Sequence, residues 1–156
     1  MARIGTLDEV AAALETARES GVVVVLANGA FDLLHVGHIR YLRAAKALGD
    51  LLVVAVNSDA SVRRAKGADR PVVPEQERLE ILSALEAVDW LVLFDEDTVA
   101  NVIERLRPDI QAKGTDYTAE NVPEAALVRA YGGRVAIVGD PKDHSTTEVV
   151  ERLQDE

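Results

Sequence analysis

Short apolar runs alternate with helical patterns along the whole chain, and this alternation constrains the fold more than any other feature. The runs span residues 22–27, 51–57, 90–94, 109–113 and 135–139. They are apolar throughout, as expected for parallel strands buried on both faces. Six helical patterns flank these runs, which is the rhythm of βα units. We therefore predict an α/β fold with a five-stranded, mostly parallel sheet and helices on both faces.

The length and composition are those of one domain with a large core. The chain has 156 residues, of which 48% are hydrophobic, enough for a sheet covered on both faces. We expect a single domain over residues 1–156, with residues 1–20 forming an N-terminal helix that packs on it. Thr6 and Glu9 have the spacing of a capping box, and that first helix is expected to end near Gly21.

Composition also excludes several classes of function. The absence of cysteine excludes disulfides, thiolate zinc sites and cysteine nucleophiles. A formal net charge of -10 argues against general nucleic-acid binding, which requires a basic face. The apolar runs are too short to span a membrane, and the N-terminal stretch lacks the apolar segment of a signal peptide. We therefore expect a cytoplasmic protein without nucleic-acid or membrane partners.

The segment between the first strand and the following helix carries the strongest functional signal. It reads Asn28-Gly29-Ala30-Phe31-Asp32-Leu33-Leu34-His35-Val36-Gly37-His38. Free N–H groups and the helix dipole favour an anion at such a helix start. His35 and His38 add side-chain donors to the same place. A lone histidine is more often structural, but two at a helix start directly after a strand predict a phosphate site.

This segment resembles the signature of the cytidylyltransferase-like nucleotidyltransferases, Gly-x-Phe-Asp-x-x-His-x-Gly-His. The family also has a Ser/Thr-rich helix start near the C-terminus, which is similar to Ser145-Thr146-Thr147 here. The resemblance implies a Rossmann-like, HIGH-type fold. It also implies that His35 and His38 bind the triphosphate and stabilise the transition state at the α-phosphorus. By the same resemblance, the loop residues Asn28, Gly29, Ala30, Phe31 and Asp32 contact the nucleotide.

The chemistry that the resemblance implies needs no nucleophile from the protein. In-line displacement at phosphorus requires stabilisation of charge on the equatorial oxygens and on the departing pyrophosphate. Hydrogen-bond donors and a divalent ion meet that requirement. No group of His, Asp and Glu residues has the pattern of a dedicated metal site, so we expect Mg²⁺ to arrive with the nucleotide.

A finer similarity points to one branch of the family, the heptose 1-phosphate adenylyltransferases, over roughly residues 21–153. The matching segments are residues 56–67, 70–72, 84–90, 94–98, 106–109 and 113–117. In this branch a lysine of the loop after the second strand neutralises phosphate charge, and it falls on Lys66. Residues 58–74 show no clear periodicity, so we expect a loop there.

The same resemblance implies further contacts. Arg78 is expected to reach phosphate, although a helix-surface salt bridge with Glu75 or Glu77 is the structural alternative. The loop containing Lys113, Gly114 and Asp116 follows the fourth predicted strand and is expected to contact the sugar and base. Ser145, Thr146 and Thr147 are expected to bind the β and γ phosphates or the adenine, or simply to cap the last helix.

Three positions depart from the family pattern. Ala30 replaces the usual cysteine or valine, Thr115 replaces a usual glycine, and His144 replaces arginine or cysteine. Thr115 adds a branched side chain near the expected sugar. Residues 140–143 are also acidic for a triphosphate-facing loop, unless their carboxylates point outward or help to hold magnesium.

The leading hypothesis is transfer of AMP from ATP to D-glycero-β-D-manno-heptose 1-phosphate, which gives ADP-heptose, a lipopolysaccharide precursor, and pyrophosphate. The resemblance implies a homodimer, and a separate sugar kinase would supply the sugar 1-phosphate. One alternative is a cytidylyltransferase that uses CTP and glycerol 3-phosphate, which the patterns at 84–89 and 113–117 disfavour. The other is a non-catalytic nucleotide-binding module, which the intact His35, His38 and Lys66 disfavour.

Overall fold

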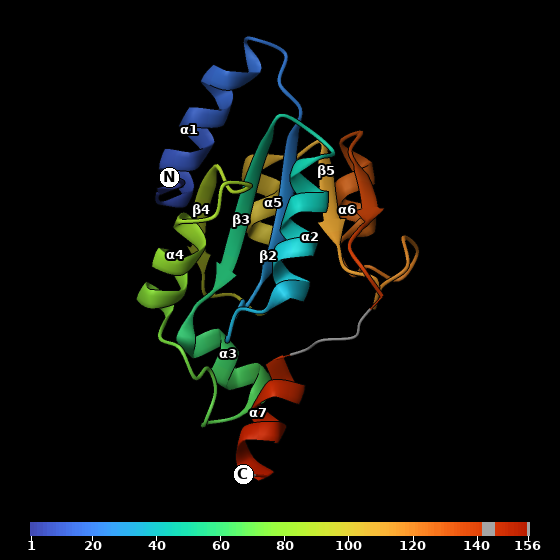
Figure 1. The fold of residues 1–156 in the computed structure, drawn as a ribbon. Coiled ribbons are helices and arrows are strands. Elements are labelled where there is room, and N and C mark those ends of the chain that lie inside the picture. The colour runs from blue at the N-terminus through green and yellow to red at the C-terminus, as the bar shows by residue number, and fades with distance from the viewer. Residues whose placement is uncertain (142–145, 156) are drawn as a thin grey trace.

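The computed structural model describes residues 1–141 and 146–155, and these form a parallel sheet between helices (Figure 1). The sheet has six strands in the order β1-β4-β3-β2-β5-β6, and every neighbouring pair is parallel. The strands are β1 (Arg3–Ile4), β2 (Val24–Gly29), β3 (Leu51–Asn57), β4 (Trp90–Phe94), β5 (Ile110–Lys113) and β6 (Arg134–Ile137). Each of the five predicted apolar runs therefore overlaps a strand.

The predicted number of strands was wrong by one, because β1 was not foreseen. Arg3 and Ile4 pair in parallel with Trp90 and Leu91 at the edge of the sheet, and the N–H of Gly5 donates to the carbonyl of Leu91 over 3.0 Å. Both side chains of β1 are exposed, so the strand lacks the apolar run that marks a buried strand. Only pairing with β4 reveals it.

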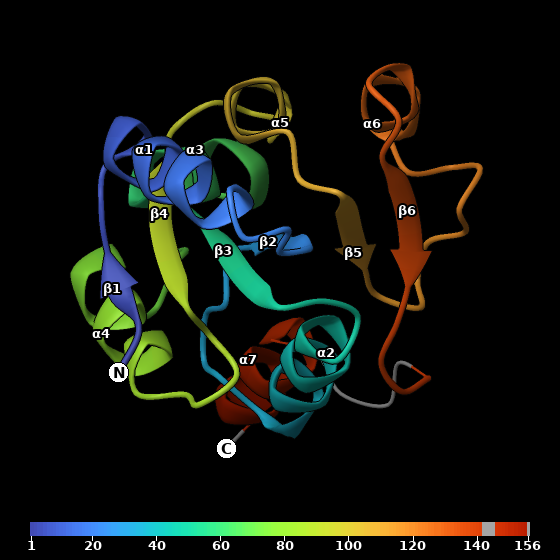
Figure 2. The ribbon, with the colours of Figure 1, turned by 90° about the horizontal axis from the view of Figure 1, so that it is seen from above.

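The helices form one layer on each face of the sheet and a group beyond its carboxyl edge. They are α1 (Leu7–Arg18), α2 (Val36–Lys46), α3 (Asp59–Lys66), α4 (Glu75–Ser83), α5 (Ala100–Leu106), α6 (Ala125–Ala130) and α7 (Thr146–Asp155). Figure 2 shows α1, α5 and α6 on one face and α2 and α4 on the other. In Figure 1, α3 and α7 lie beyond the ends to which the strand arrows point. No helix in the described ranges is long and apolar enough to cross a bilayer.

Two apolar cores separate these layers, one on each side of the sheet. Along β2, Val24 and Leu26 face the core that contains Leu14 of α1 and Ile103 of α5. Val25 and Ala27 face the opposite core, which contains Leu42 of α2 and Leu82 of α4. Because successive strand residues point to opposite faces, burial on both faces requires a continuous apolar run. Burying one such leucine contributes about 1.5–3 kcal/mol.

The first helix begins where the sequence predicts. The hydroxyl oxygen of Thr6 accepts from the N–H of Glu9 over 3.1 Å, and the Glu9 carboxylate accepts from the N–H of Thr6 over 3.1 Å. This is the predicted capping box. The helix ends at Arg18, and Gly21 follows in a left-handed conformation with φ of 75°.

The expected loop over residues 58–74 is helical in its first half, which corrects the prediction. Ser58 caps α3, since its hydroxyl oxygen accepts from the N–H of Ser61 over 3.1 Å. The helix ends at Lys66, and Gly67 follows it with φ of 111°. Val62 is the single apolar side chain that α3 buries, so the helix shows no apolar periodicity in the sequence. Residues 67–74 form the connection from α3 to α4.

The strand order places a crevice at the carboxyl ends of β2 and β5. The order β4-β3-β2-β5-β6 runs outward in both directions from β2, so the helices that follow β2 and β5 cover opposite faces. Those helices are α2 and α6, which diverge at this point of the sheet (Figure 2). This is the Rossmann-like arrangement that the resemblance implies, and ligands bind at such a reversal of strand order.

Candidate active site

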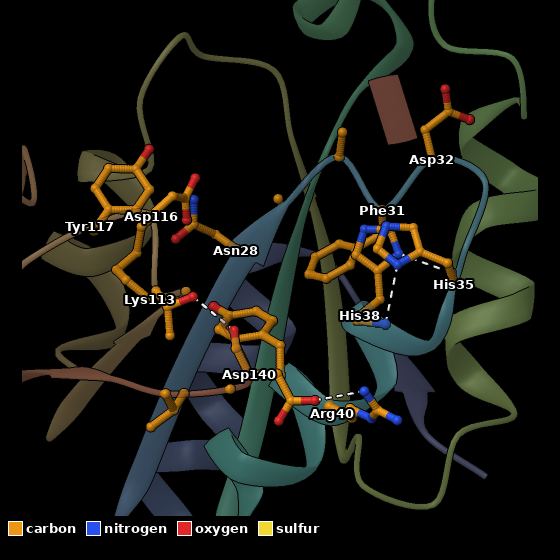
Figure 3. A pocket seen from close by; sticks show the side chains of 18 of the residues that line it. Asn28, Phe31, Asp32, His35, His38, Arg40, Lys113, Asp116, Tyr117 and Asp140 are labelled. Carbon is orange, nitrogen blue, oxygen red and sulfur yellow. Dashed lines mark hydrogen bonds and ion pairs between the residues drawn. The ribbon is translucent and has the colours of Figure 1, made fainter. Parts of the chain in front are cut away.

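A cavity of about 450 Å³ opens at this reversal of strand order, and it brings together most of the predicted site residues (Figure 3). The predicted residues in its lining are Asn28, Gly29, Ala30, Phe31, Asp32, His35, His38, Lys66, Lys113, Gly114 and Asp116. They come from the carboxyl ends of β2 and β5, from the loop before α2, from α2 and from the end of α3. Residues 138–141, which follow β6, complete the wall.

His35 and His38 form a stacked pair at the start of α2. His35 is the N-cap residue, and its Nδ1 accepts from the N–H of Gly37 over 3.1 Å. Nδ1 of His38 accepts from the N–H of His35 over 3.2 Å. A neutral imidazole has one acceptor and one donor nitrogen, so both rings carry their hydrogen on Nε2. The pair is therefore arranged to donate hydrogen bonds through Nε2.

The surroundings of His38 keep its ring neutral. Burial above all, and then the nearby His35 and Lys66, lower the pKa of His38 from its usual value of 6.5 to about 4, whereas Asp32 acts in the opposite direction. At neutral pH the ring is uncharged. It can therefore stabilise developing negative charge by donating a hydrogen bond, without first transferring a proton.

The loop between β2 and α2 is held in a constrained shape under the histidines. Phe31 and Leu33 are both left-handed, with φ of 53° and 46°, a conformation that costs a residue with a side chain roughly 1–2 kcal/mol. The buried ring of Phe31 lies 5.5 Å from the His38 ring and stacks on Tyr41 at 6.5 Å between centroids. This packing stabilises the loop shape and supports His38 from below.

The opposite wall of the cavity is formed by residues that follow β5 and by the end of β2. Figure 3 shows Asn28, Lys113, Asp116 and Tyr117 together on that side. Lys113 is largely buried, and its Nζ lies 4.5 Å from the centroid of the Tyr117 ring. Burial lowers the pKa of Lys113, and the carboxylates of Glu124 and Asp116 oppose that shift. Within the described part of the chain, the buried Oδ1 of Asn28 has no hydrogen-bond partner.

Three further residues at the rim were not predicted as site residues. The hydroxyl of Thr115 donates to the backbone carbonyl of Asp140 over 2.7 Å, and Nη1 of Arg40 lies 2.7 Å from the Asp140 carboxylate. All three line the cavity. Asp140 therefore pairs with Arg40 of α2. This ion pair offsets part of the negative charge that was expected to disfavour phosphates. The sequence signals for this group were the departure at Thr115 and the acidic stretch that begins at Asp140.

Lys66 approaches the cavity from the carboxyl end of α3. It is exposed, and its charge contributes to the lowered pKa of His38. The structure thus places a flexible cation in the same cavity as the histidine pair. An ammonium group in this position matches the expected neutralisation of phosphate.

The structure places Arg78 outside the lining of the cavity, and its side chain is fully buried. Its guanidinium donates to the carbonyls of Val73 (2.9 Å), Ala30 (2.6 Å) and Asn57 (2.8 Å), and to the carboxylate of Asp59 (2.8 Å). Its position does not support the expected contact with phosphate. Arg78 joins three segments instead. Most of its partners are backbone carbonyls of distant segments, and such partners leave no pattern in the sequence.

The remaining predicted residues are Ser145, Thr146 and Thr147, near the C-terminus. Ser145 is outside the described residues, as is His144. Thr146 and Thr147 are the first residues of α7. Along the chain they follow the cavity-lining residues 138–141 within a few positions.

Comparison with known proteins assigns the family. The cytidylyltransferase-like family model matches residues 26–152. The bifunctional protein HldE of Syntrophotalea carbinolica is 54% identical over 142 residues, which are 91% of this chain and 29% of that protein. The bifunctional protein HldE of Pseudomonas aeruginosa is 47% identical over 148 residues, or 95% of this chain and 31% of that protein. The chain thus spans less than a third of these curated relatives.

A solved structure gives the same result over most of its length. The lipopolysaccharide core biosynthesis protein from Thermoplasma volcanium GSS1 is 39% identical, with a TM-score of 0.62 over 76% of this chain and 95% of that one. The family match covers most of this chain and includes the strand, loop and helix that form the histidine site. The chain belongs to the cytidylyltransferase-like family.

Proposed function

We propose that this chain is a nucleotidyltransferase that transfers AMP from ATP to D-glycero-β-D-manno-heptose 1-phosphate, giving ADP-heptose and pyrophosphate. The observation that carries the proposal is the stacked pair His35 and His38, whose Nδ1 atoms both accept backbone hydrogens. Both rings therefore act as donors through Nε2, at the strand-order reversal where nucleotides bind in such sheets. The choice of a heptose phosphate rests on the similarity of residues 21–153 to that branch.

In the proposed reaction, an oxygen of the sugar phosphate attacks the α-phosphorus of ATP. The bond from the α-phosphorus to the bridging oxygen breaks, and its electrons leave with pyrophosphate. Negative charge then increases on the oxygens around phosphorus, where neutral imidazole donors stabilise it. His38 suits this role because its lowered pKa keeps the ring neutral at neutral pH.

The charge of the phosphates is proposed to be balanced by Lys66 and Mg²⁺. Lys66 lines the same cavity as the histidines, its charge acts on His38, and its flexible stem can follow the leaving group. Among the residues that the structure describes, no group of three or more His, Cys, Asp or Glu side chains is suited to hold a metal. We therefore propose that Mg²⁺ enters with the triphosphate and keeps phosphate oxygens and water as its main ligands.

The nucleoside is proposed to occupy the opposite wall. Lys113, Asp116 and Tyr117 supply a cation, a carboxylate and an aromatic ring there, and Asn28 supplies an amide. Ribose hydroxyls and a purine base present complementary acceptors, donors and a flat face. The triphosphate would then extend from this wall toward His35 and His38.

A sugar kinase activity is proposed to supply the acceptor, because phosphorylation of a sugar at its anomeric hydroxyl yields a sugar 1-phosphate. A homodimer is proposed from the family resemblance. Light scattering coupled to size-exclusion chromatography checks the second point, and a monomer at micromolar concentration would contradict it.

The proposed function is tested by pyrophosphate release from the purified chain with Mg²⁺. Each of the four nucleoside triphosphates is offered with a panel of sugar and polyol phosphates that includes both anomers of the heptose 1-phosphate. We expect release with ATP and the β-anomer. Release with CTP and glycerol 3-phosphate would retain the mechanism and change the substrates.

Absence of release with every pair would contradict the proposal. A raised melting temperature in saturating ATP would, in that case, indicate a nucleotide-binding module, since a ligand that binds only the folded state stabilises it.

A further inference from the structure

Asp32 is among the residues that line the cavity, but both oxygens of its carboxylate bind backbone N–H groups of the connection between α3 and α4. The side chain is only 1% exposed. Its Oδ2 accepts from the N–H of Val72 and its Oδ1 from the N–H of Val73, both over 2.9 Å. Figure 3 shows Asp32 pointing away from the imidazoles of His35 and His38. Both oxygens of Asp32 thus hold the connection between α3 and α4 on the histidine loop.

Arg70 supplies the charge that this buried carboxylate needs. Its side chain is 10% exposed, and its Nε lies 3.5 Å from Oδ2 of Asp32. In the described residues, Nε and Nη2 of Arg70 have no hydrogen-bond partner. Removing either member of a buried ion pair leaves an uncompensated charge, which is strongly unfavourable. The two residues therefore depend on each other across the contact between the loop and the connection.

Arg78 joins the same two segments at a second point. Its guanidinium binds the carbonyl of Ala30, two residues before Asp32, and the carbonyl of Val73. The histidine loop and the connection are therefore cross-linked by a buried carboxylate on one side and a buried guanidinium on the other. Such paired anchors leave the connection few alternative positions.

The connection begins directly after Lys66. The N–H of Arg70 donates to the carbonyl of Gly67 over 3.2 Å, so a turn links the Asp32 ion pair to the residue after Lys66. Lys66 itself is exposed and ends a short helix that buries few apolar side chains. The attachment of residues 67–74 therefore constrains the backbone that follows Lys66, while Arg64 holds the same end of α3 to Asp97 and to the carbonyl of Asp95.

We propose that Asp32 is a positioning residue which, with Arg70, sets Lys66 relative to His35 and His38. This inference rests on the proposed function and differs from the expected contact between Asp32 and the nucleotide. Asp32 acts through the connection, because both of its oxygens are engaged by backbone N–H groups.

The test is a double-mutant cycle of Asp32→Asn and Lys66→Ala, measured as turnover in pyrophosphate release. Asparagine has one acceptor oxygen for two N–H donors and no charge for Arg70, so we expect turnover to fall at least about tenfold, which corresponds to about 1.4 kcal/mol. In the Lys66→Ala background the same substitution should cost less than about threefold, since the group that it positions is gone. Equal costs in both backgrounds would overturn the proposal.

Asp69→Asn is the matched control. Asp69 lies in the same connection but is exposed, so its substitution should change turnover by less than about twofold. If Asp32→Asn does not fold, Arg70→Met serves instead, because it removes the cation and leaves both hydrogen bonds of Asp32. Turnover should be lowered in Arg70→Met and largely retained in Arg70→Lys, which keeps the positive charge. A loss in Arg70→Lys as large as that in Arg70→Met would count against a role for the charge.

A second measurement separates this proposal from the proposed function. Amide hydrogen exchange at Val72 and Val73 should be faster in Asp32→Asn than in the unaltered chain, and unchanged in Asp69→Asn. Unchanged exchange at these two amides would overturn the attachment whatever the activity. If the unaltered chain releases no pyrophosphate on any substrate pair, the proposed function fails, while the exchange result still decides the attachment.

Discussion

The imidazole rings of His35 and His38 stack with their centroids 3.9 Å apart and their planes inclined by 27°. The backbone stabilises this arrangement from below, since the Nδ1 atom of each ring accepts an N–H from the start of α2. Positive charge on one ring disfavours protonation of the other. His35 accordingly contributes to the lowered pKa of His38. The pair is therefore arranged to donate hydrogen bonds while both rings are neutral.

The stability of the fold should decrease in acid because of His38. Its pKa is about 4 in the folded protein and 6.5 when unperturbed. Between these values the unfolded chain binds a proton that the folded protein does not, so the free energy of unfolding falls as the pH is lowered. This group alone contributes at most about 1.4 kcal/mol per pH unit. Urea unfolding at four pH values about one unit apart, from about 4.5 to about 7.5, measures how the free energy of unfolding changes with pH.

His38→Asn provides the comparison for that measurement. We expect its stability to depend less on pH between about 4 and 6.5 than that of the unaltered chain. An identical dependence in both proteins would show that His38 does not titrate in this range.

His38→Ala should lower turnover by about 10² or more, which is the cost of removing one donor to the transition state. The substitution also removes the acceptor for the N–H of His35, so a modest loss of stability is expected at the same time. Steady-state pyrophosphate release and thermal unfolding distinguish the two effects. A turnover near that of the unaltered chain would refute the assigned role.

Lys66→Ala should lower turnover at least about tenfold and leave the melting temperature nearly unchanged, because an exposed side chain contributes little to stability. Arg63→Ala is the control, since Arg63 is an exposed cation on the same helix. A melting temperature that falls while turnover is retained would contradict the placement of Lys66 at the phosphates.

Arg78→Met should be among the most destabilising substitutions in the chain. It leaves three backbone carbonyls and the carboxylate of Asp59 without their donor, and breaking a buried ion pair costs about 3–5 kcal/mol. Urea unfolding measures the change. Arg105→Met is the control, since Arg105 pairs with Asp8 at the surface, where an ion pair contributes less than about 1 kcal/mol. Equal effects would contradict a structural role for Arg78.

Thr115→Val should raise the KM for the nucleotide by about two- to tenfold, because it removes a hydrogen bond of about 0.5–1.5 kcal/mol while conserving the shape. The bond holds Asp140 at the rim, next to the segment that leads to α7. Thr115→Ser retains the hydroxyl and should restore the KM. If valine and serine behave alike, the hydroxyl has no part in nucleotide binding.

The strands, the first helix and the histidine loop were predictable because each is recorded in neighbouring residues. Burial on both faces of the sheet requires unbroken apolar runs, as in residues 51–57. The capping box depends on residues three positions apart, and Thr6 and Glu9 make it as predicted. The loop with His35 and His38 also follows directly from its position between a strand and a helix.

Other features follow from contacts between segments that lie far apart in the sequence. The strand β1 exists because β4 offers an unpaired edge, and α3 forms without an apolar stripe. The partners of Arg78 and Asp32 are mostly backbone groups, and every residue type presents the same carbonyl and N–H. No side-chain pattern therefore announces them.

The sequence by itself determined the α/β architecture, the family and the position of the histidine loop between β2 and α2, because local periodicity and a contiguous motif contain that information. Tertiary structure alone decided which polar residues reach the cavity and which hold it together. Asp32 belongs to the motif and Arg70 and Arg78 lie far from it in the sequence, and only the fold shows that their charges are directed into the protein. The physical reason is that a buried charge is stabilised by its partners, and those partners come from segments that meet only in the folded chain.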